Sequence, residues 1–74
     1  MKIEIKYQND NIEYKFNLFE NINDYDKVIY INCSYNYHQL TLLPELPNSL
    51  KYLYCINNKF IKNIKYKYLK QFNL

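Results

Sequence analysis

The sequence predicts one small α+β domain, with an N-terminal β-hairpin, a short parallel sheet and a C-terminal helical cap. Three observations predict it. Apolar and polar residues alternate on both sides of an Asn/Asp-rich turn near the N-terminus, a nine-residue segment recurs 22 positions later, and residues 60–74 carry an amphipathic pattern. Since 74 residues provide only one hydrophobic core, we take 1–74 as a single domain.

The composition excludes several enzyme classes. Asn, Lys, Tyr and Ile fill more than half of the positions, and Gly, Ala, Arg and Trp are absent, which is typical of a genome biased toward A and T. A chain without Gly cannot form the Gly-rich loops that hold nucleotide phosphates, nor the nucleophile elbow of the GxSxG type. Nucleotide-binding and hydrolytic enzymes of those classes are therefore excluded.

Residues 1–27 are predicted to form a hairpin and a connection. The alternation with charged residues places these apolar residues on one face: Ile3, Ile5, Tyr7, Ile12, Tyr14 and Phe16. Between the two runs lies Gln8-Asn9-Asp10-Asn11, and Asn and Asp tolerate the backbone conformations of tight turns. For residues 18–27 we expect a short helical or irregular connection.

The segments 28–36 and 50–58 repeat one another. Written one above the other, VIYINCSYN and LKYLYCINN align Ile31 with Leu53 and Cys33 with Cys55. Because equivalent segments of structural repeats stack side by side, we expect two adjacent parallel strands with both cysteines buried. The two prolines of the intervening LTLLPELPNS exclude a regular helix and favour an extended return path.

The second copy resembles the leucine-rich repeat family. The family pattern LxxLxCxxNxLxxLP is met by Leu50, Leu53, Cys55, Asn58, Phe60 and Ile64. The string LPELPNSLKYLYC resembles the short repeats of bacterial effectors and giant DNA viruses, and FNIP-type repeats share its NSLxxL portion. The resemblance implies a solenoid fragment with about two leucine-rich-repeat-like units over 28–64, and the compositional bias favours the viral source.

The first copy departs from this pattern. If Leu40 and Leu43 are in register, CSYNYHQL carries two extra residues, so either Asn36 or His38 takes the position of Asn58. A side-chain amide at that position satisfies backbone groups where the chain leaves the strand.

The outward-facing residues of the two predicted strands are the candidate partner-binding residues: Tyr30, Asn32, Tyr52, Tyr54 and Ile56. Tyrosines on a rigid sheet are enriched at protein interfaces. The first hypothesis is therefore a non-enzymatic protein–protein interaction module. Since about three repeats are needed for an independently stable stack, we also expect self-association or residence in a larger complex.

Charge is divided unevenly along the chain. Residues 1–49 carry four lysines against seven acidic residues, whereas residues 50–74 carry six lysines and no acidic residue. We expect residues 60–74 to form a basic amphipathic helical cap. The alternative function is a small nucleic-acid-binding accessory protein that uses Lys62, Lys65, Lys67 and Lys70. A structural virion component is a third hypothesis.

We predict no catalytic residue, no metal site and no cofactor. Cys33, Cys55 and His38 are too few for a structural zinc site, and both cysteines fall at inward positions where a small apolar residue belongs. The carboxylates form no pair at catalytic spacing. No apolar run approaches the length of a membrane span, and the N-terminus lacks a signal-peptide core. We therefore expect a cytoplasmic protein, in the host-cell cytoplasm or the virion if it is viral, without membrane partners.

Overall fold

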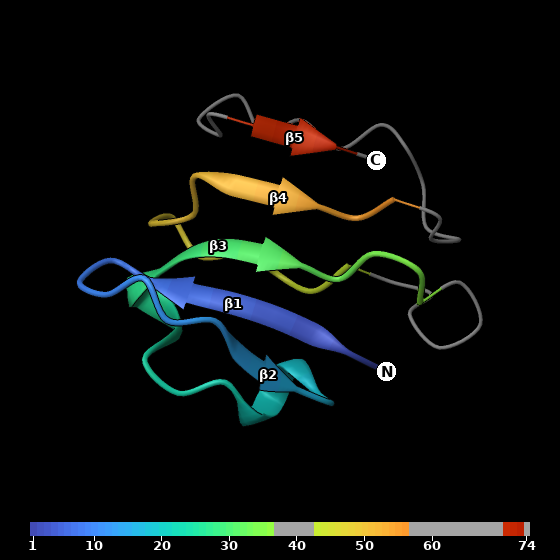
Figure 1. The fold of residues 1–74 in the computed structure, drawn as a ribbon, viewed down its shortest axis with the longest axis horizontal. Helices are drawn as coiled ribbons and strands as arrows, with labels where there is room; N and C mark the ends of the chain where they lie inside the picture. The colour runs from blue at the N-terminus through green and yellow to red at the C-terminus, as the bar shows by residue number, and fades with distance from the viewer. Residues whose placement is uncertain (37–42, 57–70, 74) are drawn as a thin grey trace.

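The structure, a computed structural model, describes residues 1–36 and 43–56 and the backbone of residues 71–73. Its strands form one mixed sheet in the order β2-β1-β3-β4-β5 (Figure 1). The strands are β1 (Ile3–Tyr7), β2 (Tyr14–Phe16), β3 (Val28–Asn32), β4 (Tyr52–Tyr54) and β5 (Gln71–Asn73). Helical structure in the described residues is limited to two 3₁₀ turns, η1 (Phe19–Asn21) and η2 (Tyr25–Lys27).

The predicted hairpin is confirmed. β1 and β2 pair antiparallel, with Ile3 opposite Phe16 and Ile5 opposite Tyr14. In the turn between them the Asp10 carboxylate accepts a hydrogen bond from the backbone N–H of Ile12, at 3.1 Å. Asp fills this role because its short side chain reaches the backbone two residues further on.

The hairpin is joined to the rest of the sheet through β1. This strand pairs antiparallel with β3, so that Ile5 lies opposite Ile31 and Lys6 lies opposite Tyr30, and the register shifts between Lys6 and Tyr7. β1 is therefore an interior strand, and the hairpin extends the sheet beyond the repeated segment.

The two repeated segments form the predicted parallel pair. Ile31 lies beside Leu53 in β3 and β4, which is the 22-residue register of the sequence repeat. Backbone hydrogen bonds continue beyond the strand ends, from Lys51 N–H to the carbonyl of Ile29 at 2.8 Å and from Cys33 N–H to the carbonyl of Tyr54 at 2.9 Å.

The prediction of a helical cap is wrong at residues 71–73, and the rest of that segment, 60–70 and 74, lies outside the described residues. β5 pairs in parallel with β4, placing Phe72 beside Leu53. In the sequence, LKQFNL (69–74) repeats LKYLYC (50–55) at a spacing of 19. An apolar pair three residues apart suits one face of a helix and also the LxxL portion of a repeat strand, and here the strand forms.

The core lies against one face of the sheet. Its buried residues come from the strands, from the connection before β3 and from the segment before β4: Ile3, Ile5, Ile22, Val28, Ile31, Cys33, Leu46, Leu50, Leu53 and Cys55. Buried and half-buried positions alternate from Ile3 to Lys6 in β1 and along β4, as the period of two predicts, whereas the buried residues of β3, Val28 and Ile31, are three apart. This alternation leaves the opposite face of the sheet for solvent or a partner.

Asn36, one of the two residues that the sequence offers for the polar position after the first strand, is buried. Its side chain is 5% exposed, and its amide donates to the carbonyls of Cys33 at 2.9 Å and Lys2 at 3.0 Å. His38 lies outside the described residues. Asn36 thus satisfies backbone groups beyond the end of β3 and ties them to the start of β1.

Candidate functional site

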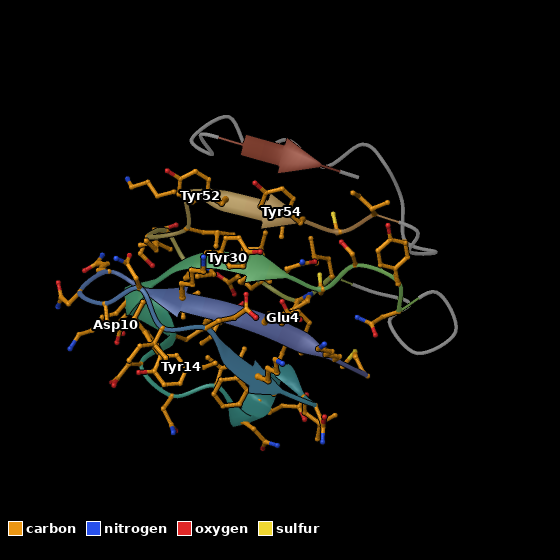
Figure 2. The ribbon with its side chains drawn as sticks, in the orientation of Figure 1. Glu4, Asp10, Tyr14, Tyr30, Tyr52 and Tyr54 are labelled. Atoms are coloured by element: carbon orange, nitrogen blue, oxygen red, sulfur yellow. The ribbon has the colours of Figure 1, made fainter. Side chains whose placement is uncertain are left out.

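The candidate site is the sheet face opposite the core, which we call the tyrosine face and define by Tyr30, Asn32, Tyr52, Tyr54 and Ile56. Figure 2 shows the three tyrosines close together over β3 and β4. The parallel register places Tyr30 directly beside Tyr52 and Asn32 beside Tyr54. All five side chains are half-buried. The structure therefore brings together Tyr30, Asn32, Tyr52 and Tyr54, and Ile56 follows two residues beyond the end of β4.

The rings of Tyr30 and Tyr54 contact each other across the two strands. Their centroids lie 5.5 Å apart and their planes are inclined by 46°. Tyr54 stands diagonally across from Tyr30, and long aromatic side chains on neighbouring strands reach each other at this offset. Aromatic pairs in such tilted arrangements contribute about 0.5–1.5 kcal/mol beyond the burial of their area.

Lys6 adds a cation to this surface, and sequence reasoning missed it. Its ammonium nitrogen lies 4.8 Å from the centroid of the Tyr30 ring. The contact forms because β1 docks on β3 with Lys6 opposite Tyr30, and a cation over a ring face is attracted by the negative π cloud. The alternation in the hairpin predicts that Lys6 faces away from the core, but only the docking of β1 brings it to Tyr30.

The Tyr30 hydroxyl stands in a partly desolvated position. Burial raises the pKa of Tyr30 above its ordinary value of 10.0, the charges of Glu13 and Glu4 raise it further, and a hydrogen bond with Asn32 opposes the rise. The phenol therefore stays neutral at physiological pH and keeps its capacity to donate and accept hydrogen bonds.

Short polar contacts hold the chain at the C-terminal ends of β3 and β4. The Asn32 side-chain oxygen accepts from the backbone N–H of Ser34 at 3.1 Å. The Ser34 hydroxyl accepts from the backbone N–H of Ile56, also at 3.1 Å. The first bond fixes the chain at the end of β3, and the second joins the end of β3 to the end of β4, so together they stiffen this end of the tyrosine face.

The cysteines are core residues. Cys33 and Cys55 are both buried and are not joined in a disulfide. Burial raises the pKa of Cys33 to about 12 and that of Cys55 to about 11, so both thiols are protonated and weakly nucleophilic near neutral pH. Within the part of the chain that the structure describes, no group of three or more His, Cys, Asp or Glu residues is placed to hold a metal ion.

The second set of candidate residues is not placed by the structure. Lys62, Lys65, Lys67 and Lys70 fall within residues 57–70, outside the described residues.

Comparison with family models, with curated proteins and with solved structures found no match to this chain. In the described ranges, the structure contains no helix that is long and apolar enough to cross a membrane.

Proposed function

We propose that the protein is a non-enzymatic binding module that recognises a protein partner through the tyrosine face. The observation that carries the proposal is the continuous surface of Tyr30, Tyr52 and Tyr54 on adjacent strands, with Lys6 packed on one ring. Tyrosine combines a large apolar ring with a polar hydroxyl and loses little conformational entropy on binding, which is why it is enriched at interface centres.

The rigidity of the surface supports this proposal. Tyr30 is held between Lys6 and Tyr54, and the strands beneath are hydrogen-bonded on both sides. A surface that is ordered before binding does not lose side-chain freedom in the complex, so more of the contact energy appears as affinity.

The proposal also includes the architecture that the sequence suggests. We propose that residues 28–64 belong to a short leucine-rich-repeat-like stack, that the protein self-associates or resides in a larger complex, and that it acts in the cytoplasm, of an infected host if it is viral. The in-register parallel pairing of β3, β4 and β5 supports the stack.

The test of the tyrosine face is a cross-linking experiment in the native cell. A photoreactive amino acid is placed at position 52, and the cross-linked partner is identified and then produced for a direct binding titration. We expect Tyr54→Ser together with Tyr30→Ser to weaken binding at least about a hundredfold, because each central aromatic anchor contributes about 2 kcal/mol or more and the variant removes two of them.

The matched control is Ile12→Ser, which removes an apolar side chain that is 56% exposed in the hairpin turn, outside the tyrosine face. This variant is expected to bind the partner as the unaltered chain does. Equal loss of binding in the control and in the tyrosine variant, or full binding in both, contradicts the proposal.

The nucleic-acid alternative rests on the concentration of lysines in residues 50–74. If Lys62, Lys65, Lys67 and Lys70 bind phosphates, affinity for single-stranded RNA falls steeply with salt, and replacing the four lysines by Glu abolishes it. Retention of that binding in the tyrosine variant then favours the alternative over the tyrosine face. A virion component is distinguished by co-purification of the chain with assembled particles.

A further inference from the structure

A second feature lies on the other side of the sheet, where the hairpin meets η2. Here a cavity of about 420 Å³ is lined by Tyr7, Gln8, Asn9, Asp10, Tyr14, Phe16, Asn23, Asp24 and Lys27. Its size falls within the range of small-molecule sites in proteins. Tyr7 and Tyr14 belong to β1 and β2 and follow the alternation of Ile3 and Ile5, so the cavity is on the core side of the sheet, away from the tyrosine face.

Three of the lining residues are aromatic, and two of them form an ordered pair. The rings of Tyr7 and Tyr14 meet edge to face, with centroids 5.2 Å apart and planes inclined by 65°. Phe16 lies on the same strand as Tyr14 and two residues away, so its ring is on the same face of the sheet. Ring faces set at a steep angle to one another form two walls of the kind that surround organic cations.

The hydroxyl ends of both tyrosines are tethered, which fixes the rings. The Tyr7 hydroxyl donates to the carbonyl of Asn23 at 2.7 Å. The Tyr14 hydroxyl donates to an oxygen of the Asp10 carboxylate at 3.1 Å, and Figure 2 labels both of these residues. The other oxygen of Asp10 accepts from the backbone N–H of Ile12. The ring geometry is therefore set by the protein before any ligand arrives, which favours binding.

The cavity also carries an excess of negative charge. Among its lining residues, Asp10 and Asp24 are opposed by Lys27 alone. The negative charge also affects the two tyrosines. Burial raises the pKa of Tyr7 most, and the charges of Asp24 and Asp10 raise it further. The pKa of Tyr14 is raised mainly by its hydrogen bond to Asp10. A positive ligand is therefore favoured over a neutral or negative one.

The hydrogen bonds of the lining residues suit a cation without N–H groups. Both oxygens of Asp10 already accept a donor from the protein, and both tyrosine hydroxyls already donate. A quaternary ammonium group has no N–H that needs an acceptor, so it is bound by ring faces and by charge alone and leaves these bonds in place.

We propose that the Tyr7–Tyr14–Phe16 cavity binds a quaternary ammonium group, as a small molecule such as choline or as a trimethylated lysine on a peptide. This site is independent of the proposed function, because its residues are not part of the tyrosine face and its failure leaves that face untouched.

The test is a titration of the full chain followed by NMR at constant ionic strength. The probes are choline, the uncharged isostere 3,3-dimethylbutan-1-ol, and one lysine peptide in trimethylated and unmodified forms. We expect ring-current shifts of the trimethylammonium protons and shifts of the Tyr7 and Tyr14 ring signals. The affinity for choline should be about tenfold above that for the alcohol, since a partly desolvated cation–π contact contributes about that factor.

The peptides distinguish a modified protein from a small molecule as the source of the quaternary ammonium group. Tighter binding of the trimethylated peptide than of choline assigns the site to modified proteins, and the reverse assigns it to the small molecule.

Matched variants distinguish the loss of an aromatic ring in the cavity from a general effect on the fold. Tyr14→Leu keeps apolar volume but removes the ring, and we expect it to weaken choline binding about tenfold, while Tyr14→Phe keeps the ring and stays within about threefold of the unaltered chain. Lys27→Gln removes the opposing charge and is expected to tighten binding. Leu18→Ser, at a position that is 45% exposed and does not line the cavity, is the control and should leave choline binding unchanged.

The proposal is overturned by any of three results. These are equal affinity for choline and the neutral alcohol, shifts that map to the tyrosine face instead of Tyr7 and Tyr14, or the absence of a saturable shift for both choline and the trimethylated peptide. If Tyr14→Leu unfolds the chain, the comparison of the charged and neutral probes on the unaltered protein still decides the outcome.

Discussion

Asn36 joins parts of the chain that are 34 residues apart. Its side-chain oxygen accepts from the backbone N–H of Lys2 at 3.2 Å, and its amide donates to the carbonyls of Lys2 and Cys33. An amide is the side chain that suits this position, because it accepts from one backbone group and donates to two others at once. The bonds to Lys2 close the start of β1 onto the end of the first repeated segment.

Replacing Asn36 by Ala should destabilise the fold. We expect the free energy of unfolding to fall by about 2 kcal/mol, because the substitution leaves backbone groups of Lys2 and Cys33 without these partners. Urea unfolding followed by circular dichroism measures the change. The control is Asn48→Ala at an exposed position, for which we expect a change within about 0.5 kcal/mol. Similar values for the two variants would show that the buried amide has no special role.

Among the residues that the structure describes, two adopt the left-handed backbone conformation, in a chain that contains no glycine. Asp24 has φ 50° and stands before η2, and Tyr35 has φ 63° and is 72% exposed. Asp is a residue that tolerates this region because its short side chain bonds locally. Tyr has no such preference, so its occurrence at position 35 could not be predicted from residue type.

The parallel pair β3 and β4 places the two cysteines in equivalent inward positions. The register that pairs Ile31 with Leu53 continues to Cys33 and Cys55 two residues later, and the charge of Cys55 contributes to the raised pKa of Cys33. The repeat spacing predicted this arrangement correctly, because a shared register in a parallel sheet sends equivalent residues to the same face.

The buried thiols should make stability depend on pH in the alkaline range. In the folded chain their pKa values are raised to about 12 and about 11, from an ordinary value of 9.0, so the fold favours the protonated form. This stabilisation is complete below about pH 9 and is lost as the pH rises toward 11–12, because the unfolded chain ionises its thiols first. The free energy of unfolding, measured in urea from pH 8 to pH 10.5, should therefore decrease.

The control for this measurement is the double variant Cys33→Ala with Cys55→Ala. Tyrosines titrate in both proteins, so the difference between the two pH profiles isolates the thiols. We expect the unaltered chain to lose more stability than the double variant across this range. Parallel profiles would contradict the assignment of the pH dependence to the buried thiols.

β5 shows where element prediction reached its limit. Leu69 and Phe72 are three residues apart, and so are Leu50 and Leu53, which precede and occupy β4. A spacing of three fits a helix face as well as a repeat strand, so the local pattern does not separate the two. The pairs are 19 residues apart, whereas the segments that form β3 and β4 repeat at a spacing of 22 residues. The sequence therefore does not show β5 as a further copy at the same spacing.

At the level of the whole molecule, a single sheet with its core on one face is a small structure to be stable alone. Three parallel strands, β3, β4 and β5, lie beside a hairpin in the described structure. Repeat proteins bury their hydrophobic faces by stacking neighbours, and below about three units the stack is marginal. The proposed self-association would supply additional burial.

We expect thermal stability to rise with protein concentration. If association accompanies folding of a dimer, the melting temperature should increase by roughly 3–5 °C for each tenfold increase in concentration. Scanning calorimetry from about 1 to 100 µM, with light scattering at each concentration, measures it. A concentration-independent, two-state monomer contradicts self-association. The double variant Tyr52→Ser with Tyr54→Ser tests whether the chains associate through the tyrosine face. If they do, the melting temperature of this variant should no longer depend on protein concentration.

The sequence alone predicts the hairpin, from the alternation of apolar and polar residues, and the parallel register of β3 and β4, from the repeat at a spacing of 22 residues. Alternation assigns each strand residue to a face, and recurrence of Ile31 and Cys33 at Leu53 and Cys55 aligns two strands without knowledge of the rest of the chain. The same register places Tyr30 beside Tyr52 and Asn32 beside Tyr54, whereas the role of the tyrosine face in binding stays a prediction.

The remaining features of the fold and of the candidate sites depend on pairing between segments that are far apart in the sequence. The contact of Lys6 with Tyr30, the tether from Asn36 to Lys2 and the cavity between the hairpin and η2 all depend on β1 docking against β3, and the final strand depends on pairing with β4. Local sequence sets the period and the inward face of a strand. Which strand lies beside which depends on the burial and backbone hydrogen bonding of the whole sheet, and those are properties of distant segments brought together.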